Sequence, residues 1–432
     1  MASTISLVRA IGRWALTAVV INCVIGSGVF GLPATLAALT GAWSPAAVLI
    51  AGAGVFFIVI CFAEVGSRFD EAGGPYLYTR EAFGPALGFQ IGWLHVWTRI
   101  LAAAAVLNVF IAYVAALVPW ASTTMGRAAV MTIGMALVTF VNITGVRQAA
   151  WMVNLFTIAK LLPLAAVIVL GISAFDSQVL AAQAVPDPQW TEAVLLLIFA
   201  YGGFESAVVA GSESRDPKHD TAFALLTGMA IVTAIYALVQ LSVVAVLPNA
   251  ATHPAAVSGA LGAVLGGPGV VLGSVAVILS VYGWLAGFGL MTPRILYAMG
   301  QRGELPQVLG RVHPRTRIPD VAIIVNSALA LAFGLVSNFG QLATFSAISR
   351  LGILGMTCGA LVALRRKHGP SEGFQAPAGV LCAIVGMTFC LWLLTTRSLE
   401  QAWFLPIVVI TGMGIWRLRT RNSELRTTRS EF

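Results

Sequence analysis

The sequence predicts an all-α membrane protein with about twelve transmembrane helices, and its composition and hydropathy carry that prediction. Of its 432 residues, 58% are hydrophobic and only 10% are charged, whereas a soluble protein of this length carries about 25% charged residues. The mean hydropathy is +0.90. Apolar segments of about 20 residues, the length that crosses a bilayer, recur along the whole chain. We therefore expect a polytopic helical membrane protein without a separate soluble domain.

The apolar segments divide the chain into twelve expected spans. The third and the eighth are unusually long. The spans lie near 14–38, 44–66, 86–118, 127–145, 150–174, 190–211, 222–247, 267–299, 320–338, 342–364, 376–396 and 400–417.

The distribution of Lys and Arg orients these spans. An even number of spans with a cytoplasmic N-terminus places 20 of the 25 Lys and Arg residues on the inner side, the asymmetry of the positive-inside rule. We therefore expect a multi-pass protein of the cell (inner) membrane with both termini in the cytoplasm. The same asymmetry accounts for the net charge of +8 without nucleic acid as a partner. The exceptions are Arg99, Arg127, Lys160, Arg350 and Arg397, and the inner segments are 1–13, 67–85, 145–149, 212–221, 300–319, 365–375 and 418–432.

Cysteine and histidine positions argue against metal sites and enzyme chemistry. All five cysteines fall in expected spans without a CxxC pair, and the five histidines are scattered without an HExxH motif. A membrane enzyme would need a clustered catalytic set. We therefore expect no enzyme activity, no metal and no cofactor. The sequence also has no nucleotide-binding loop, so the energy for any transport must come from a gradient or a counter-substrate.

Two spans contain weak points in their middle. They are "VIGSGVFGLP", 24–33 in the first span, and "FAYGGFESAVVAG", 199–211 in the sixth. Glycine, serine and proline are poor helix formers, and a backbone in lipid must satisfy its own hydrogen bonds. Close helix packing explains a single glycine cluster. Two clusters five spans apart, one with a glutamate, indicate a functional interruption instead.

The separation of the two weak points predicts an inverted repeat. Because five is odd, spans 1–5 and 6–10 cross the bilayer with opposite polarity, and paired interrupted helices point to a transporter and its binding site. We expect one transmembrane domain over 1–432, with discontinuous helices 1 and 6. It comprises a first repeat at 14–174, a second at 190–364 and two extra helices at 376–417.

A broken helix offers groups that suit a particular ligand. After Gly28 a new helix begins, and its free N–H groups and positive dipole end suit a carboxylate. Unpaired carbonyls near Ile25 and Tyr201, where the first halves end, suit an ammonium group. Together these groups fit the α-carbon end of an amino acid.

At these residues the chain resembles the amino acid–polyamine–organocation (APC) superfamily of permeases, which have the leucine-transporter fold plus two extra helices. The resemblance covers nearly the whole chain. Besides the two interruptions it includes "CFAEVGSRFDEAGGPYLYTREAFG", "FTIAKLLPL" and "MGQRGELPQVLGRVHPRTRIP".

The resemblance implies a substrate site between the first, sixth and eighth spans. It implies that Trp284 of span eight is a substrate-site aromatic, although the residue is equally explained as packing between helices. The implied residues of the first span, which bind the substrate carboxylate and amine, are Ile25, Gly26, Ser27 and Gly28. Those of the sixth, which supply carbonyls and an aromatic cover, are Phe199, Ala200, Tyr201 and Gly203, and Phe204 is a further cavity candidate.

Four charged residues inside spans are candidates for coupling or gating, because intramembrane ionisable groups mark functional sites by default. Lys160 resembles a fixed amine at the sodium position of relatives, bridging spans one and eight as a proton carrier or a static cation. Glu205 is expected to act as a gate or to lock the break. Arg99, one turn after His95, would pair with Glu205, hold an acidic substrate or lie near the cytoplasmic vestibule. Arg350 belongs to an extracellular gate or to a helix–helix contact.

Polar residues at the cytoplasmic end of span two are expected to be scaffold or gate. Glu64 lies near that end, and Asp70, Glu71 and Arg80 flank an expected interfacial turn.

The expected function is a secondary active amino acid permease that works by alternating access and is proton-coupled. The mostly apolar cavity candidates favour neutral or hydrophobic amino acids, while Arg99 and Glu205 leave room for a charged side chain. An exchanger of amino acids with amines or polyamines is the alternative, and a non-transporting membrane sensor on a permease scaffold is a further class. Expected partners are the amino acid, a proton and membrane lipid, and the oligomeric state is open.

Overall fold

The computed structural model describes residues 12–69, 74–144, 146–210, 214–314, 318–398 and 402–430, and its elements are helices. The long helices are α4 (Ser44–Gly66), α6 (Pro85–Leu117), α7 (Thr124–Thr144), α8 (Val146–Ser173), α12 (Pro217–Val246), α14 (Gly267–Gln301), α15 (Asp320–Val336), α16 (Phe339–His368), α17 (Gly379–Thr395) and α19 (Phe404–Ser430). The shorter ones are α1 (Arg13–Val24), α2 (Gly28–Gly31), α3 (Pro33–Thr40), α5 (Gly74–Phe83), α9 (Ser177–Ala182), α10 (Trp190–Ala200), α11 (Phe204–Ala210) and α13 (Ala256–Leu265), with 3-10 turns η1 (Gly41–Trp43), η2 (Pro119–Ser122), η4 (Ala250–Thr252) and η5 (Gln307–Gly310).

Six helical stretches in the described ranges are long and apolar enough to cross a membrane. One of them, Pro33–Gly66, turns at Gly41, whose φ of 55° is left-handed and therefore separates α3 from α4. The prediction of an all-helical membrane protein is confirmed. The other five are Pro85–Leu117, Thr124–Thr144, Pro217–Val246, Gly267–Gln301 and Phe339–His368.

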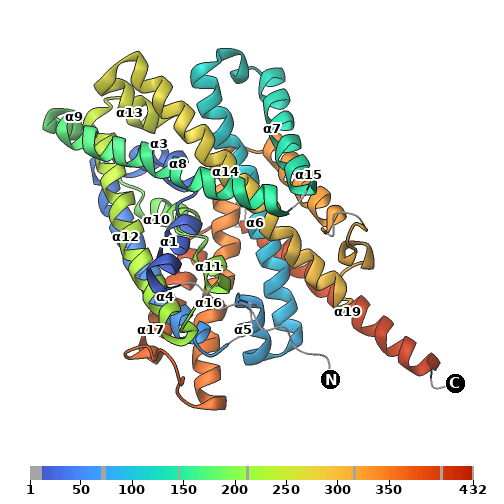
Figure 1. The fold of residues 1–432 in the computed structure, drawn as a ribbon. Helices are drawn as coiled ribbons and strands as arrows, with labels where there is room; N and C mark the ends of the chain where they lie inside the picture. Colours follow the sequence, from blue (N-terminus) through green and yellow to red (C-terminus); the bar gives the residue numbers. More distant parts are fainter. Residues whose placement is uncertain are drawn as a thin grey trace.

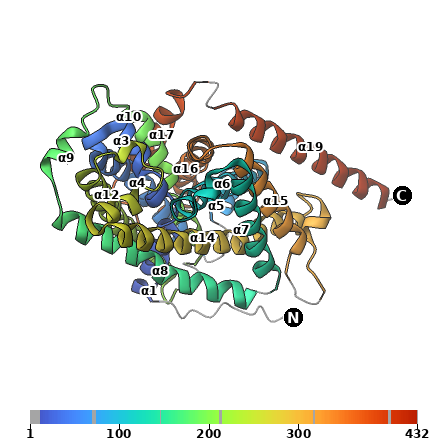
Figure 2. The same ribbon diagram turned by 90° about the horizontal axis from the view of Figure 1, so that it is seen from above.

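The helices run between two ends of the molecule, and α4, α6 and α16 lie in its middle (Figures 1 and 2). α6 packs against α14, α15 and α16, while α4 packs against α12, α16 and α17. α9 and α13 lie at one end, α5 and the end of α16 at the other, and α19 extends along the edge toward the C-terminus (Figures 1 and 2).

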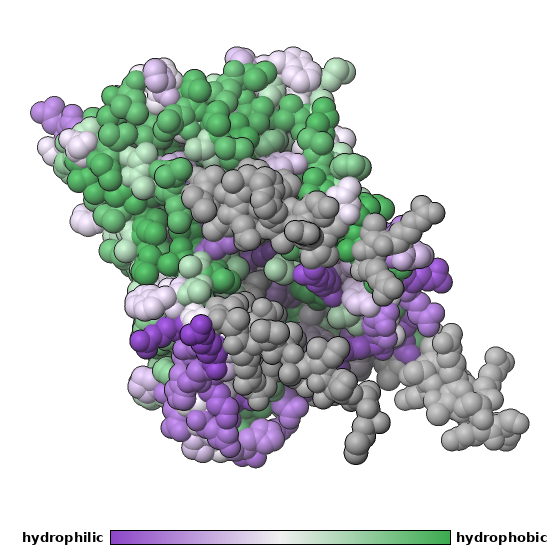
Figure 3. All heavy atoms as spheres, viewed as in Figure 1, coloured by the Kyte–Doolittle hydropathy of each residue, from purple (hydrophilic) through white to green (hydrophobic). Residues whose placement is uncertain are grey.

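The surface divides along the same direction. Figure 3 shows a largely hydrophobic surface over the part that carries α9 and α13, and hydrophilic residues at the opposite end, where α16 ends and α17 begins. We call the latter the polar end. Large apolar side chains such as Phe140 and Val169 are exposed, as expected for a surface that faces lipid tails rather than water.

The expected interfacial turn after span two is largely a helix. Asp70 and Glu71 lie outside the described residues, but the chain from Gly74 to Phe83 forms the ten-residue α5. Gly84, with a φ of 97°, then separates α5 from α6. The sequence "GGP" suggested only the loop because α5 is short and amphipathic, with Tyr78 buried and Arg80 exposed.

Both interrupted helices are present. α1 ends at Val24 and α2 begins at Gly28, while α10 ends at Ala200 and α11 begins at Phe204. The helix breaks are therefore the segments 25–27 and 201–203, as the glycine clusters predicted.

Candidate functional site

The two helix breaks lie against each other. A methyl group added to Gly28 would come within 2.5 Å of Ala200 Cα, at the end of α10. Gly203 has a φ of 123°, and a methyl group there would overlap the Cys23 carbonyl oxygen. Only glycine permits these close backbone approaches. The structure thus joins the two weak points of the sequence into one site.

The start of α2 presents unpaired donors. The amide N–H groups of Ser27, Gly28 and Val29 have no hydrogen-bond acceptor among the described residues, and Ser27 makes no side-chain cap. The next two amides, of Phe30 and Gly31, already donate to the Ser27 carbonyl at 3.1 and 2.8 Å. The first N–H groups of any helix lack partners within the helix. Here they are buried next to the other break, where an anion would satisfy them.

The carbonyls expected to be unpaired are occupied by side chains of the protein. Lys160 of α8 donates from Nζ to the carbonyls of Asn22 at 2.5 Å and Ile25 at 2.8 Å. Burial of a backbone carbonyl is costly without a donor, so the lysine supplies one. A carbonyl oxygen has two lone pairs, and Ile25 therefore keeps acceptor capacity for a ligand. Both hydrogen bonds of Lys160 go to the first span. The expected bridge also involved span eight, and these two bonds do not reach it.

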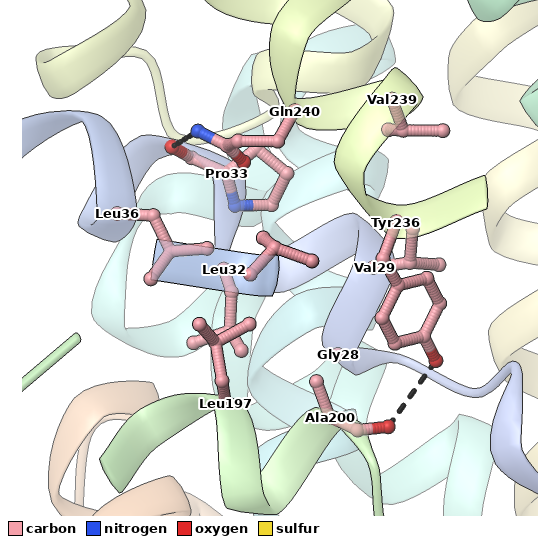
Figure 4. A pocket seen from close by; sticks show the side chains of 11 residues that line it. Gly28, Val29, Leu32, Pro33, Leu36, Leu197, Ala200, Tyr236, Val239 and Gln240 are labelled. Carbon is pink, nitrogen blue, oxygen red and sulfur yellow. Dashed lines mark hydrogen bonds between the residues drawn. The ribbon is translucent and has the colours of Figure 1, made fainter. Parts of the chain in front are cut away.

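Tyr236 of α12 occupies the neighbouring carbonyls. Its hydroxyl lies 3.2 Å from the Ala200 carbonyl oxygen (Figure 4) and 2.9 Å from that of Val24, so it joins the ends of α1 and α10. One turn further along α12, Gln240 donates to the Pro33 carbonyl at 3.2 Å. We missed both residues in the sequence, although two polar side chains four residues apart on one face of an apolar span are a usable signal.

Between these groups lies a cavity of about 10 Å³ (Figure 4). This is room for roughly one water molecule and not for an amino acid. Its lining residues are Gly28, Val29, Leu32, Pro33, Leu36, Val48, Leu197, Ala200, Tyr236, Val239 and Gln240.

Three aromatic residues of the sixth span are buried and packed. Phe199 meets Phe339 edge to face at 5.9 Å between ring centroids. Tyr201 donates its hydroxyl to the Val48 carbonyl at 2.9 Å. Phe204 packs edge to face on Phe62 of α4 at 5.0 Å. Tyr201 and Phe204 therefore contact the scaffold helix α4.

Glu205 and Arg350 hold the second break. Arg350 of α16 forms a buried ion pair with Glu205, whose other oxygen accepts from the Gly203 amide at 2.8 Å. A methyl group on Gly202 would overlap the Arg350 guanidinium. This is the helix–helix contact that was the alternative to an outer gate for Arg350, and it explains why the break needs glycine at 202.

Arg99 does not pair with Glu205. Its Nε donates to Thr292 Oγ1 at 3.4 Å, and its guanidinium carbon lies 5.0 Å from the ring centroid of Trp284. Trp284 in turn lies against the first break, because a methyl group on Gly26 would come within 2.9 Å of the indole. The structure thus brings Arg99 and Trp284 together beside the first break.

The chain is similar over nearly its whole length to known transport proteins. A family model described as amino acid permease matches residues 11–416. The chain is 29% identical to the serine/threonine exchanger SteT of Bacillus subtilis (strain 168), over 94% of this chain and 95% of that protein. It is 27% identical to the methylthioribose transporter of the same organism, over 95% and 92%. It is 25% identical to the b(0,+)-type amino acid transporter 1 of Oryctolagus cuniculus, over 84% and 77%.

The family match spans nearly the whole chain, including both helix breaks and the residues around them. The three relatives described above are named as one exchanger and two transporters. The chain belongs to the amino acid permease family.

Proposed function

We propose that this permease is a secondary carrier that moves an α-amino acid across the cytoplasmic (inner) membrane by alternating access. The observation that carries the proposal is the contact between the two breaks, Gly28 on Ala200 and Gly203 on Cys23. The substrate carboxylate binds the free amides at the start of α2, and its ammonium group binds the remaining acceptor capacity of the Ile25 carbonyl. Trp284 lies beside this position, against Gly26, and Phe199 precedes Ala200 at the end of α10.

Twelve spans in a 5+5 inverted repeat provide the framework of the proposed carrier. The element order supports this: α1 to α8 fill the first repeat (14–174), α10 to α16 the second (190–364), and α17 and α19 follow. The third and eighth spans, α6 with 33 residues and α14 with 35, are the longest helices in the described ranges and hold equivalent places. We place both termini, and hence the polar end, in the cytoplasm.

Proton coupling through Lys160 is the energy source we favour. Its ammonium group is buried and bonded to the carbonyls of Asn22 and Ile25 rather than to a carboxylate. Its proton can therefore leave without breaking an ion pair. Loss of the proton weakens its bonds to the first break, which couples protonation to movement of α1.

Amino acid exchange is the second candidate. It is supported by the similarity to SteT, which is named a serine/threonine exchanger. In an exchanger Lys160 stays charged, and only a substrate-loaded carrier reorients.

Purified protein in liposomes separates these functions. Uptake of labelled amino acid is measured with and without an inward pH gradient, and with and without unlabelled amino acid inside. Stimulation by the gradient in empty vesicles supports proton coupling, whereas uptake that requires internal substrate supports exchange. Binding without any flux would refute transport and favour a sensor.

A further inference from the structure

The centre of the molecule holds more positive than negative charge. Around the two breaks the described residues include three buried cations, Arg99, Lys160 and Arg350, and one buried carboxylate, Glu205. Glu205 pairs with Arg350. Lys160 is bonded to two backbone carbonyls. These contacts leave Arg99 as the cation that lacks both a carboxylate and a carbonyl within the described part of the chain.

The surroundings of Arg99 satisfy little of its guanidinium group. The side chain is only 7% exposed, and its single hydrogen bond to a described residue is the long one to Thr292. Stacking on Trp284 provides a cation–π contact, but it uses none of the N–H donors of Nη1 and Nη2. An arginine stays charged in proteins, and an uncompensated charge inside a membrane is costly. A carboxylate matches this unused planar fork with two parallel hydrogen bonds.

Arg99 lies next to the position proposed for the substrate backbone. The indole of Trp284 lies against Gly26, and the guanidinium of Arg99 lies over the ring of the same indole. Phe288 stacks on the same indole at 6.1 Å, which fixes the orientation of Trp284. One aromatic ring therefore separates the first break from the unsatisfied cation. The side chain of an amino acid bound at the first break can therefore extend past Trp284 toward Arg99.

We infer that Arg99 is a specificity-determining residue that binds the side-chain carboxylate of an acidic amino acid. This inference rests on the proposed function, in which the breaks bind the α-carboxylate and the ammonium group. Glu205 does not oppose an acidic side chain, because Arg350 already neutralises it. This inference favours an anionic side chain over the neutral or hydrophobic one expected from the apolar side chains, because the guanidinium offers it a charge-assisted hydrogen bond.

The experiment compares acids with amides of the same shape. Uptake of a labelled amino acid into proteoliposomes is competed with glutamate against glutamine, and with aspartate against asparagine. We expect each acid to compete on the order of 10- to 100-fold better than its amide, since a charge-assisted bidentate contact is lost in the amide. Arg99→Gln abolishes this preference, and Arg99→Lys restores only part of it because lysine lacks the fork.

Arg127→Gln is the matched control. Arg127 of α7 is also partly buried, but it donates to the carbonyls of Gly334 and Ser337 and to the Asn108 side chain, away from both breaks. This variant keeps the ratio of acid to amide competition even where it loses stability.

The outcomes distinguish this inference from the proposed function. Transport with equal competition by acid and amide, or an acid preference that persists in Arg99→Gln, overturns the inference and leaves the permease intact. Failure to transport any amino acid overturns the proposed function itself. Where Arg99→Gln does not fold, the wild-type competition ratio still decides, together with a larger rise in Tm with glutamate than with glutamine.

Discussion

Two buried glutamates in this permease have opposite surroundings. Glu64, at the polar end of α4, accepts hydrogen bonds from Arg68 at 3.0 Å, from Arg365 at 2.8 and 2.5 Å, and from the Ala376 amide at 2.8 Å. Glu205, at the second helix break, accepts from the Arg350 guanidinium and from the Gly203 amide. The first carboxylate is surrounded by donors, while the second has one guanidinium and one amide.

The two carboxylates also differ in the parts of the molecule that their donors connect. The donors to Glu64 tie α4 to α16 and to the connection before α17, and Ser67 reinforces that contact through Ser371 at 3.0 Å. Arg365 remains 26% exposed, so this cluster reaches the polar end. Arg350 is only 3% exposed and lies on the break itself. Both carboxylates are buried, so burial alone does not separate them; what differs is that the Glu205–Arg350 pair lies on an interrupted helix.

Glu205→Gln is expected to have the largest effect of the variants that test this difference between Glu205 and Glu64. It leaves Arg350 buried without a counter-charge, and we expect a loss of about 3–5 kcal/mol in unfolding free energy together with loss of transport. Denaturation in detergent and uptake in proteoliposomes measure the two effects.

The double variant Glu205→Gln with Arg350→Met separates stability from function. It removes both charges, so most of the stability returns, but the break is no longer held by α16 and transport stays low. A double variant as unstable as the single one would show that the ion pair is not what stabilises this break.

Glu64→Gln is expected to have a smaller effect of another kind. Arg68 and Arg365 lose their carboxylate, but Arg365 can turn toward the polar end, so the loss of stability is about 1–3 kcal/mol. Transport per folded molecule is retained, because Glu64 contacts neither break. A folded Glu64→Gln protein that no longer transports would move this cluster from scaffold to gate.

Lys160→Met tests the buried cation that has carbonyls in place of a counter-ion. We expect the variant to lose its stimulation by an inward pH gradient, since no group remains to release a proton at Asn22 and Ile25. Lys160→Arg is the control, because it keeps the positive charge and the donors but holds its proton. A proton carrier fails in both variants. Gradient-driven transport by Lys160→Met would refute the proposed coupling, and full activity of Lys160→Arg would assign a static cation.

The sequence contains the fold and the backbone of the site because both leave local signals. Long apolar segments predict membrane helices, and "IGSG" and "YGG" predict breaks at the residues where α1 and α10 end. The side-chain contacts around the two breaks leave no such local signal in the sequence. Glu205 and Arg350 are 145 residues apart, and helix rotation decides whether Arg99 faces Glu205 or Trp284. The occupation of the Ile25 carbonyl by Lys160 likewise depends on how α8 crosses α1.

A third glutamate, Glu304, extends the comparison of Glu64 with Glu205, and its substitution is expected to change stability least. It follows α14 near the polar end, where Oε1 accepts from the Tyr76 hydroxyl at 3.0 Å and lies 3.7 Å from Arg80, while Oε2 is buried without a partner in the described ranges. Burial raises the pKa of this carboxyl above its ordinary value of 4.5, against the smaller lowering effects of Tyr76, Arg302 and Arg80. With one oxygen hydrogen-bonded and the other not, Glu304 has fewer hydrogen bonds than Glu64 but more than an unpaired carboxylate.

The raised pKa fixes the sign of a pH dependence. Between the ordinary pKa and the raised one, the folded protein binds this proton more strongly than the unfolded chain, so stability falls as pH rises through that window and is constant above it. Glu304→Gln removes this slope and raises stability at neutral pH by less than about 1 kcal/mol. Tm measured at a series of pH values tests this. In Glu372, by contrast, the hydrogen bond from Lys218 lowers the pKa, so its contribution falls as pH decreases, and Glu372→Gln changes the slope in the opposite direction. Equal slopes in the two variants would mean that burial does not govern Glu304.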